Sequence, residues 1–451
     1  MNVVNHIFKA YDIRGLVGSE LSVNLAYNIG RAYATLLLQE KANIADKKVV
    51  VGHDMRPTSE EYEAAVIRGL TESGISVVSI GLVSTPLFNF VCTNSPCLGG
   101  INVTASHNPA EYNGFKIIRA NGLGVPTSTI RDLIIAEQFE STSAHGVVTS
   151  SDPYPEYQKA VLDRIDASVL RPLKVVVDFG NGMGSLTLTK LLSTLPFKMV
   201  YLYDTLDGTF PHHEANPLKV ETLRDLQKKV LETKADFGFA FDGDGDRIGL
   251  VDETGTVVGA SFVGALVGLE VLRRHPKSLL LYDLRSSRIV PEVWEAAGAR
   301  SEMTKVGYVN IRQKMLDTKA AFASELSLHL YFGDLGNVEI SDLSFLYVAE
   351  RLSRENKKLS ELLRPLQKYF HSGEINFTIA DKDAALEKIE KKYAPLAKKV
   401  SHLDGIWLQF DWGWLNVRCS NTEPLVRLNL EATTEQVMKE KVAELTELLK
   451  V

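Results

Sequence analysis

The chain of 451 residues has few cysteines and little net charge, and both features exclude classes of protein. Its three cysteines, Cys92, Cys97 and Cys419, lack the spacing of a zinc site and cannot all pair with one another. We expect them to be reduced thiols, as in a cytoplasmic protein. The net charge of −6 gives no general attraction for nucleic acid or for an anionic membrane surface. Any anion site must therefore depend on local cations.

Long apolar runs are also missing. Residues 1–8 lack the basic start and apolar run of a signal peptide. The most apolar predicted helix, 262–272, is too short to cross a bilayer, and we expect it to be buried. The length suggests about three or four domains, and the composition is typical of a globular enzyme. These features predict a cytoplasmic protein with neither nucleic acid nor membrane as a partner, and they leave the choice between monomer and dimer open.

What the chain does contain is a repeated alternation of buried strands and helices, which predicts parallel α/β sheets. A capping box, Thr58-x-x-Glu61, is expected to start a helix that continues to about Glu72. After residue 371 the pattern changes to the strands 405–411, 414–419 and 426–431 with two helices, which predicts an antiparallel α+β domain. We expect three mixed α/β domains and a fourth of α+β type, with these bounds: 1–150, 151–254, 255–370 and 371–451.

The first candidate site follows the predicted strand 98–103. That strand ends at a polar turn that carries Ser106, and such a turn can present a hydroxyl at the carboxyl edge of a sheet. Asn113-Gly114 is typical of a tight turn, and Lys116 follows it with a long cationic side chain. Taken alone, the stretch is more typical of an ordinary polar loop.

A second candidate site is Asp242-Gly243-Asp244-Gly245-Asp246-Arg247, which follows the predicted strand 236–241. Three carboxylates separated by glycines suit a hard divalent cation, and ligands that are all oxygen favour Mg²⁺. An EF-hand is the main alternative. It is disfavoured because its sixth position requires glycine and holds Arg247.

Another glycine cluster, Gly180-x-Gly182-x-Gly184, invites a dinucleotide-binding interpretation. Its spacing differs from G-x-G-x-x-G, so we expect a tight strand-to-helix turn instead.

Three further stretches carry weaker signals. Arg14 precedes Gly15 and suits bidentate phosphate binding. Glu325, Ser327 and His329 alternate, so an extended segment would direct them to one side. The stretch from Arg418 through Ser420, Asn421 and Thr422, with Arg427 beyond it, is either an anion cradle or a surface turn.

Together these stretches resemble the α-D-phosphohexomutases, the phosphomannomutase/phosphoglucomutase enzymes. Thr-Ala-Ser-His-Asn-Pro followed by Asn-Gly-Phe-Lys, in residues 104–116, resembles the phosphoserine loop of that family. Four other motifs occur in the family's order. These are the opening around Tyr11 and Arg14, the Asp242–Arg247 metal loop, the Ser324–His329 sugar-binding loop and the phosphate-binding loop that begins at Arg418.

The resemblance implies a four-domain phosphohexomutase with one loop of each domain at a central cleft. Ser106 would carry a phosphate, and Mg²⁺ would be held by Asp242, Asp244, Asp246 and the phosphoserine. Arg14, Lys116 and His329 would assist transfer, with the choice of base between Lys116 and His329 left open. Hexose 1,6-bisphosphate would be the intermediate and the activator. The residues implied in binding the phosphosugar substrate are Tyr11, His107, Arg247, Arg285, Tyr308, Glu325, Ser327, Arg418, Ser420, Asn421, Thr422 and Arg427.

Departures from the family's pattern concern the sugar. Arg285 replaces a lysine, Tyr308 replaces a histidine, and Ser324 and Leu328 replace glycines. The choice between mannose and glucose is therefore open. A phosphoglucosamine mutase is one alternative. A metal-dependent phosphatase with a serine nucleophile and a non-catalytic protein that binds divalent ions are two others.

Overall fold

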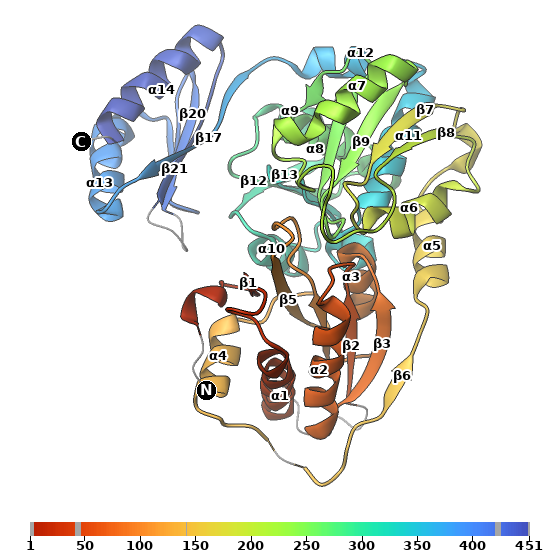
Figure 1. Cartoon of the computed structure of the whole chain (residues 1–451). Helices are drawn as coiled ribbons and strands as arrows, with labels where there is room; N and C mark the ends of the chain where they lie inside the picture. The colour runs from red at the N-terminus through yellow and green to blue at the C-terminus, as the bar shows by residue number, and fades with distance from the viewer. Residues whose placement is uncertain (1–3, 41–46, 141, 420–424, 450–451) are drawn as a thin grey trace. The chain divides into compact units, whose positions relative to one another are not determined.

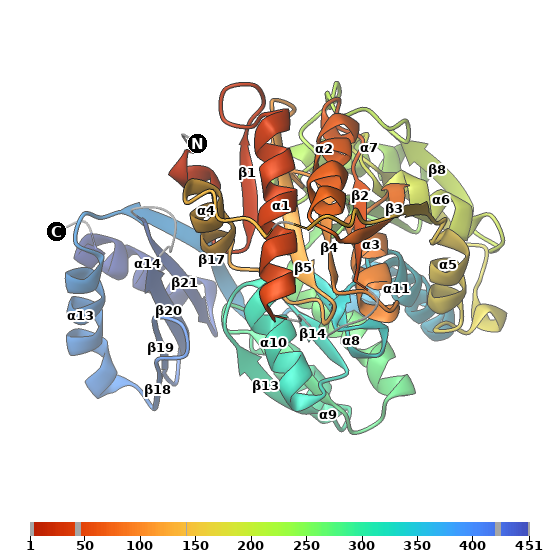
Figure 2. The same cartoon turned by 90° about the horizontal axis from the view of Figure 1, so that it is seen from below.

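A computed structural model describes residues 4–40, 47–140, 142–419 and 425–449 (Figures 1 and 2). The chain divides into two compact units, which are described separately below. The first comprises Met1–Val258 and Ser327–Leu359, and the second comprises Gly259–Leu326 and Ser360–Val451. None of the helices in the described ranges combines the length and apolar character that a membrane span requires.

The first sheet of unit one has six strands in the order β1-β5-β4-β2-β3-β6. The strands are β1 (Asp12–Leu16), β2 (Lys48–His53), β3 (Ser76–Leu82), β4 (Gly99–Val103), β5 (Tyr112–Arg119) and β6 (Val148–Ser150). Strands β4, β2, β3 and β6 are parallel, as the alternation predicts, but β5 is antiparallel to both β4 and β1. The prediction of a purely parallel sheet is therefore wrong at this edge.

The predicted turn at Asn113-Gly114 is also wrong, because both residues lie within β5. Gly114 is needed there for close approach, since a Cβ atom would clash with the carbonyl oxygens of Ile13 and Thr104. The amide of Asn113 donates to the hydroxyls of Thr58 and Ser59 at 2.9 and 3.0 Å. Thr58 therefore precedes α2 (Ser59–Glu72) without making the predicted side-chain cap.

Helices pack on both faces of this sheet (Figure 2). On one face, α1 (Val23–Glu40), α2 and α4 (Thr127–Ile135) share an apolar core with alternate residues of β2, β4 and β5. Gly30 and Gly69 allow α1 and α2 to meet backbone to backbone. On the other face, α3 (Thr85–Asn94) packs Phe88 and Cys92 against Gly100 of β4.

The second sheet of unit one has the order β11-β10-β9-β7-β8. Its strands are β7 (Lys174–Asp178), β8 (Lys198–Leu202), β9 (Phe237–Phe241), β10 (Ile248–Asp252) and β11 (Val257–Val258). The associated helices are α5 (Tyr154–Leu162), α6 (Gly184–Leu192) and α7 (Arg224–Thr233). The predicted tight turn at 180–184 is confirmed, and β10 and β11 form a hairpin. A 3₁₀ turn, Val220–Leu223, precedes α7.

Residues 327–359 complete this unit with β15 (Leu330–Phe332), β16 (Val338–Glu339) and α11 (Ser341–Glu355). Phe345 of α11 packs against Phe237 and Phe239 of β9, with ring centroids 5.6 and 5.2 Å apart. This segment is therefore anchored in the core of the second sheet.

Unit two contains three parallel strands with β12 (Leu279–Asp283) between β13 (Arg300–Thr304) and β14 (Phe322–Ser324). Their helices are α8 (Ala260–Arg274), α9 (Ile289–Ala296) and α10 (Tyr308–Thr318), and the short α12 (Leu359–Leu363) begins at the boundary of the two units. The C-terminal part is an antiparallel sheet, as predicted, in the order β17-β21-β20-β19-β18. Its elements are β17 (Phe370–Thr378), β18 (Lys399–Ser401), β19 (Ile406–Gln409), β20 (Gly413–Cys419), β21 (Leu425–Ala432), α13 (Lys382–Tyr393) and α14 (Glu435–Leu449).

Candidate active site

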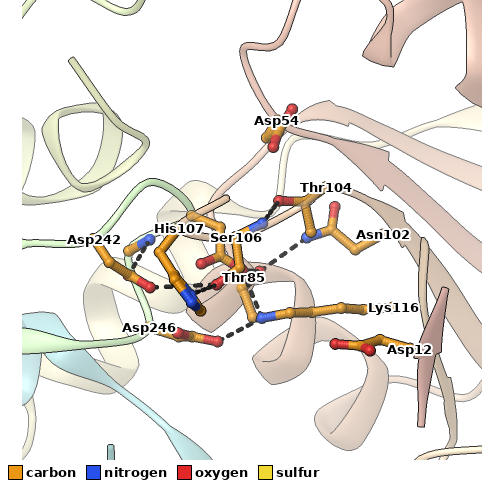
Figure 3. A network of polar contacts seen from close by, with 12 residues as sticks. Asp12, Asp54, Thr85, Asn102, Thr104, Ser106, His107, Lys116, Asp242 and Asp246 are labelled. Atoms are coloured by element: carbon orange, nitrogen blue, oxygen red, sulfur yellow. Dashed lines mark hydrogen bonds and ion pairs between the residues drawn. The ribbon is translucent and has the colours of Figure 1, made fainter. Parts of the chain in front are cut away.

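Ser106 lies in the loop that joins β4 to β5, just beyond the carboxyl end of β4, as predicted (Figure 3). Its backbone is left-handed, with φ at 55°, a conformation that a serine adopts only when its surroundings hold it there. The backbone N–H of Ser106 donates to the hydroxyl of Thr104 at 2.9 Å. The hydroxyl of Ser106 lies 3.3 Å from Nδ1 of His107. This oxygen is thus fixed at the edge of the sheet.

A buried arginine that the sequence analysis missed holds the whole loop. The guanidinium of Arg56 donates to four backbone carbonyls, those of Ser106, Asn108, Pro109 and Tyr112, at 3.0, 2.5, 2.8 and 2.8 Å. It also pairs with Asp54 at 3.3 Å. Arg56 follows the carboxyl end of β2, the neighbour of β4. Because ligand sites lie at the carboxyl ends of strands, the position of Arg56 after β2 could have identified it as a candidate site residue.

The three aspartates follow β9, and the first of them, Asp242, contacts Ser106 although 136 residues separate the two. The Ser106 hydroxyl lies 3.3 Å from Asp242 Oδ2. The N–H groups of Gly245 and Arg247 each donate to Asp242 Oδ1 at 3.1 Å. Gly243 is required by this proximity, since a Cβ atom would come within 2.5 Å of the Ser106 carbonyl oxygen.

These carboxylates fit a hard divalent cation. One oxygen from each of Asp242, Asp244 and Asp246 lies within 4.8 Å of the others, and all three residues are buried. Oδ1 of Asp244 is buried without a hydrogen-bond partner, so it remains available as a ligand. Burial and the carboxylates of Asp244 and Asp246 raise the pKa of Asp242 well above its usual range. A cation bound by all three would relieve that repulsion.

Lys116 supplies positive charge to the same cluster. From β5 its Nζ donates to Oδ2 of Asp244 and Oδ2 of Asp246, at 2.6 Å each (Figure 3). Burial alone would lower the pKa of Lys116, but the two aspartates outweigh it and the pKa is raised. Lys116 is therefore protonated at neutral pH and suited to stabilising charge rather than to accepting a proton.

Arg14 is brought to the Ser106 loop by β1. Its guanidinium donates to the Ala105 carbonyl at 3.2 Å and to Oδ1 of Asn108 at 2.8 Å. Asp12, two residues earlier on the strand, pairs with Arg14 at 2.7 Å. The sequence analysis missed Asp12, although its spacing of two from Arg14 predicts the same face of a strand.

Thr85 and Asn102 form a second layer behind the aspartates. The Thr85 hydroxyl donates to Oδ2 of Asp244 at 2.6 Å and accepts from the amide of Asn102 at 3.1 Å. The backbone N–H of Thr85 donates to the Asp244 carbonyl at 2.9 Å. The N-terminal residue of helix α3 therefore contacts Asp244, and these bonds fix the orientation of that carboxylate.

His329 lies beside the aspartates and Arg247. Its Nε2 is 3.2 Å from Arg247 Nε and 3.3 Å from Asp246 Oδ1. Its Nδ1 is 2.8 Å from the Ser327 hydroxyl. The neutral ring can accept from Arg247, whereas the protonated ring can donate to Asp246. His329 thus has a partner in both protonation states, which suits a group that moves a proton.

The predicted extended conformation of residues 325–329 is wrong. The segment is a turn, and Leu328 has φ at 70°. Leu328 stands where the family's pattern has glycine, so here a leucine adopts a left-handed backbone that favours glycine. In this turn the Leu328 carbonyl accepts from the N–H of Ile248 at 3.3 Å.

Unit two holds the rest of the predicted site. Glu325, in the loop after β14, accepts from the N–H of Gly307 at 3.0 Å and lies 3.4 Å from Arg285. Tyr308 begins α10, and the Arg312 guanidinium lies over its ring. Arg418 and Arg427 face each other on β20 and β21.

The structure thus brings together, within unit one, Arg14, Ser106, His107, Lys116, the three aspartates, Arg247, Ser327 and His329, with Tyr11 just before β1. Arg285, Tyr308, Glu325, Arg418 and Arg427 belong to unit two. Ser420, Asn421 and Thr422 lie outside the described residues.

Comparison with known families gives four matches along the chain. Residues 5–145, 155–255 and 261–369 match α/β/α domains I, II and III of phosphoglucomutase/phosphomannomutase, and 374–448 match the C-terminal domain. The chain belongs to the phosphoglucomutase/phosphomannomutase family. This membership confirms the predicted family, the fold class of three α/β domains and a further C-terminal domain, and an enzyme of the hexose phosphate mutase type.

Individual family members are similar over nearly their full length. A phosphomannomutase of Methanocaldococcus jannaschii is 39% identical over 98% of this chain and 97% of its own. A phosphomannomutase/phosphoglucomutase of Pseudomonas aeruginosa is 34% identical over 96% of this chain and 93% of its own. A crystal structure of a family protein from Burkholderia thailandensis, 31% identical, superposes with a TM-score of 0.91 and covers 100% of this chain and 98% of its own.

Proposed function

We propose that this enzyme interconverts hexose 1-phosphate and hexose 6-phosphate, with mannose or glucose as the sugar. Ser106 carries the transferred phosphate, and a hexose 1,6-bisphosphate is the intermediate and the activator. The observation that carries the proposal is the position of the Ser106 hydroxyl, 3.3 Å from Asp242 in a loop of three aspartates. The names of the relatives, which include mannose and glucose enzymes, support the sugar class.

Phosphoryl transfer depends on in-line placement and charge neutralisation. Arg56 and Thr104 orient the loop and its serine, and Lys116 and Arg14 bring cationic nitrogens to the same place. Asp242, Asp244 and Asp246 would hold Mg²⁺, which when bound supplies further positive charge to the transferring group. Because Lys116 is held protonated by two aspartates, we propose His329 as the group that accepts the proton of the attacking sugar hydroxyl.

Further residues would position the sugar. Glu325 and Ser327 would offer oxygens to sugar hydroxyls, and Arg418 and Arg427, with Ser420, Asn421 and Thr422, would hold the phosphate that is not reacting. Binding energy at that remote phosphate orients the sugar and allows either phosphate to face Ser106 in turn. We also retain the prediction that the chain has four domains, with the bounds 1–150, 151–254, 255–370 and 371–451.

A single incubation tests the proposal against its rivals. The protein is mixed with mannose 1-phosphate or glucose 1-phosphate, Mg²⁺ and a trace of the matching 1,6-bisphosphate. Sugar 6-phosphate supports the mutase, free phosphate supports a phosphatase, and no turnover supports a binding protein. Glucosamine 1-phosphate in a parallel sample tests the phosphoglucosamine branch. The Ser106→Ala variant should lose nearly all mutase turnover.

A further inference from the structure

Arginines that the proposed function assigns to phosphate binding already hold an anion, the carboxylate of Glu374. Glu374 lies on β17, next to β21 in the C-terminal sheet. Its Oε2 accepts from Arg418 Nη2 at 2.9 Å and lies 3.3 Å from Arg285 Nη1. Its Oε1 lies 3.6 Å from Arg427 Nη1. Three arginines from three segments therefore converge on one carboxylate.

Strand register explains why an anion is needed at this place. Arg418 and Arg427 stand directly opposite each other on β20 and β21, where like charges repel. Glu374 is paired in register with Asn429 of β21, whose amide lies 3.4 Å from Oε2. The carboxylate therefore lies beside both arginines, at the next residue pair on the same face of the sheet, and reduces the repulsion between them. Although burial would raise it, Arg285 and Arg418 lower the pKa of Glu374 to about 2, so the group is charged at neutral pH.

Arg285 joins the cluster through one part of its guanidinium. Nε and Nη2 are held by the two carboxylate oxygens of Asp283, at 3.3 and 2.7 Å. Nη1 is the nitrogen directed at Glu374. A lysine, the residue of the family's pattern here, is a single point charge and could not hold both carboxylates with this geometry. The arginine at 285 therefore allows one side chain to contact both Asp283 and Glu374.

The arginines of this cluster already have carboxylate partners. Arg285 pairs with Asp283, Glu325 and Glu374, and both Arg418 and Arg427 pair with Glu374. A dianionic phosphate gains less from arginines that are already paired with carboxylates than from unpaired ones. Glu374 is also the most accessible of the three acids, with 24% of its side chain exposed against 0% and 4% for Asp283 and Glu325. It is therefore the acid best able to move aside.

We propose that Glu374 is an internal stand-in for the substrate's phosphate: it occupies the arginines between substrates and is displaced when the non-reacting phosphate binds. The inference rests on the proposed function, which assigns that phosphate to Arg418 and Arg427. In the reaction, Glu374 would promote release of the bound phosphate from the arginines. A bisphosphate that must turn round has to leave the arginines, and a carboxylate that takes its place makes departure easier.

The test is binding of inorganic phosphate to the full-length protein, measured by calorimetry. Glu374→Gln keeps the size and hydrogen-bonding capacity of the side chain and removes its charge. We expect it to lower the dissociation constant on the order of tenfold, because the phosphate no longer competes with a carboxylate. Glu390→Gln is the control. The carboxylate of Glu390, which is partly exposed on α13, pairs only with His402 among the contacts described for it, so its replacement should leave phosphate binding unchanged.

Combining Glu374→Gln with Arg418→Ala tests whether the change in phosphate affinity arises at the arginines. In Arg418→Ala, Glu374→Gln should change phosphate binding less than it does in the wild type, because one of the arginines for which phosphate and Glu374 compete is missing. In turnover, Glu374→Gln should lower KM and kcat together, since phosphate binds more tightly and leaves more slowly. Glu374→Asp, whose shorter side chain retracts the carboxylate, gives an independent variant and should also bind phosphate more tightly than wild type.

Weaker or unchanged phosphate binding by folded Glu374→Gln and Glu374→Asp would overturn the inference and make Glu374 an orienting partner of the arginines. Thermal melting establishes that the variants are folded. Phosphate binding requires no turnover, so this result is separate from the proposed function. That function fails instead when the wild-type protein makes no sugar 6-phosphate.

Discussion

The hydroxyl oxygen of Ser106 lies 3.3 Å from Oδ2 of Asp242, and this contact joins two loops that follow strands of different sheets. Both loops are held from behind by buried side chains, Arg56 for the serine loop and Thr85 for the aspartate loop. The geometry of the site therefore depends on residues that do not touch the reacting atoms, and each can be tested.

Replacing Arg56 by lysine should slow turnover without removing charge. Lysine cannot donate to four carbonyls in the fork geometry of a guanidinium, so the Ser106 loop loses its support. We expect kcat to fall at least tenfold with a smaller change in KM, and the free energy of unfolding to fall by about 2–4 kcal/mol. Steady-state kinetics and denaturant titration measure both.

The matched control for this change is Arg119→Lys. Arg119 pairs with Glu40 at a partly exposed position, away from the serine loop, and its replacement should affect neither quantity appreciably. An Arg56→Lys enzyme with wild-type kcat would show that the serine loop keeps its geometry without the arginine.

The Thr85 hydroxyl should influence metal affinity. Thr85→Val removes the donor that orients Oδ2 of Asp244 while keeping the shape of the side chain. Outer-layer partners of metal ligands typically contribute on the order of 10-fold to 100-fold in affinity, so the Mg²⁺ concentration for half-maximal activity should rise by roughly that factor. Thr189→Val, whose hydroxyl donates only within α6 among its described contacts, is the control and should leave the Mg²⁺ dependence unchanged.

Much of this fold could be predicted because the strands are short apolar runs that end at polar turns. The predicted strands 98–103 and 414–419 correspond to β4 and β20 to within one residue at each end. Strand β5 was misread because Asn113-Gly114 is typical of turns, whereas the glycine here serves the close contact with Ile13 and Thr104. Local sequence carries no information about a neighbouring strand that arrives from elsewhere in the chain.

In the candidate site, too, local motifs could be predicted and long-range contacts could not. Ser106, Lys116 and the aspartates stand in compact motifs with evident chemistry. Arg56 and Thr85 stand in ordinary sequence, and their roles depend on carbonyls and carboxylates up to 159 residues away. Such partners are defined only by the tertiary structure.

Removal of divalent cations should abolish turnover and lower thermal stability. The buried carboxylates of the aspartate loop repel one another, and Lys116 balances only part of that charge. Mg²⁺ added at about 100 times its dissociation constant should stabilise the chelator-treated protein by about 2.7 kcal/mol. Melting curves with and without Mg²⁺ measure the effect. Asp244→Asn should lose most of it, whereas Asp163→Asn, at an exposed position of a surface pair, should retain it.

Stability should depend on pH through Asp342. Asp342 of α11 is buried, and Tyr157 of α5 donates to its Oδ2 at 2.7 Å. Burial raises the pKa of Asp342 to about 6 from an ordinary value near 3.8. An acid whose pKa is higher in the folded than in the unfolded state makes its full contribution to stability below the unfolded pKa. For Asp342 that contribution is lost as the pH rises from about 4 through 6, and it amounts to about 2–3 kcal/mol.

Asp342→Asn should therefore melt at a higher temperature than the wild type at pH 8, and the difference should shrink towards pH 4. The asparagine carbonyl can still accept from Tyr157, so the packing is retained. Asp163→Asn again serves as the control and should show no such trend. A difference between Asp342→Asn and wild type that stays constant across this pH range would contradict the assignment.

The central claim is that Ser106 carries the phosphate, and transfer of a labelled phosphate tests it directly. The enzyme is incubated with hexose 1,6-bisphosphate labelled on phosphorus, separated from the sugar, digested and mapped by mass spectrometry. We predict label on the peptide that contains Ser106, and loss of that label to hexose bisphosphate when unlabelled hexose monophosphate is added. An enzyme that turns over with label on another residue, or with none, would contradict the account.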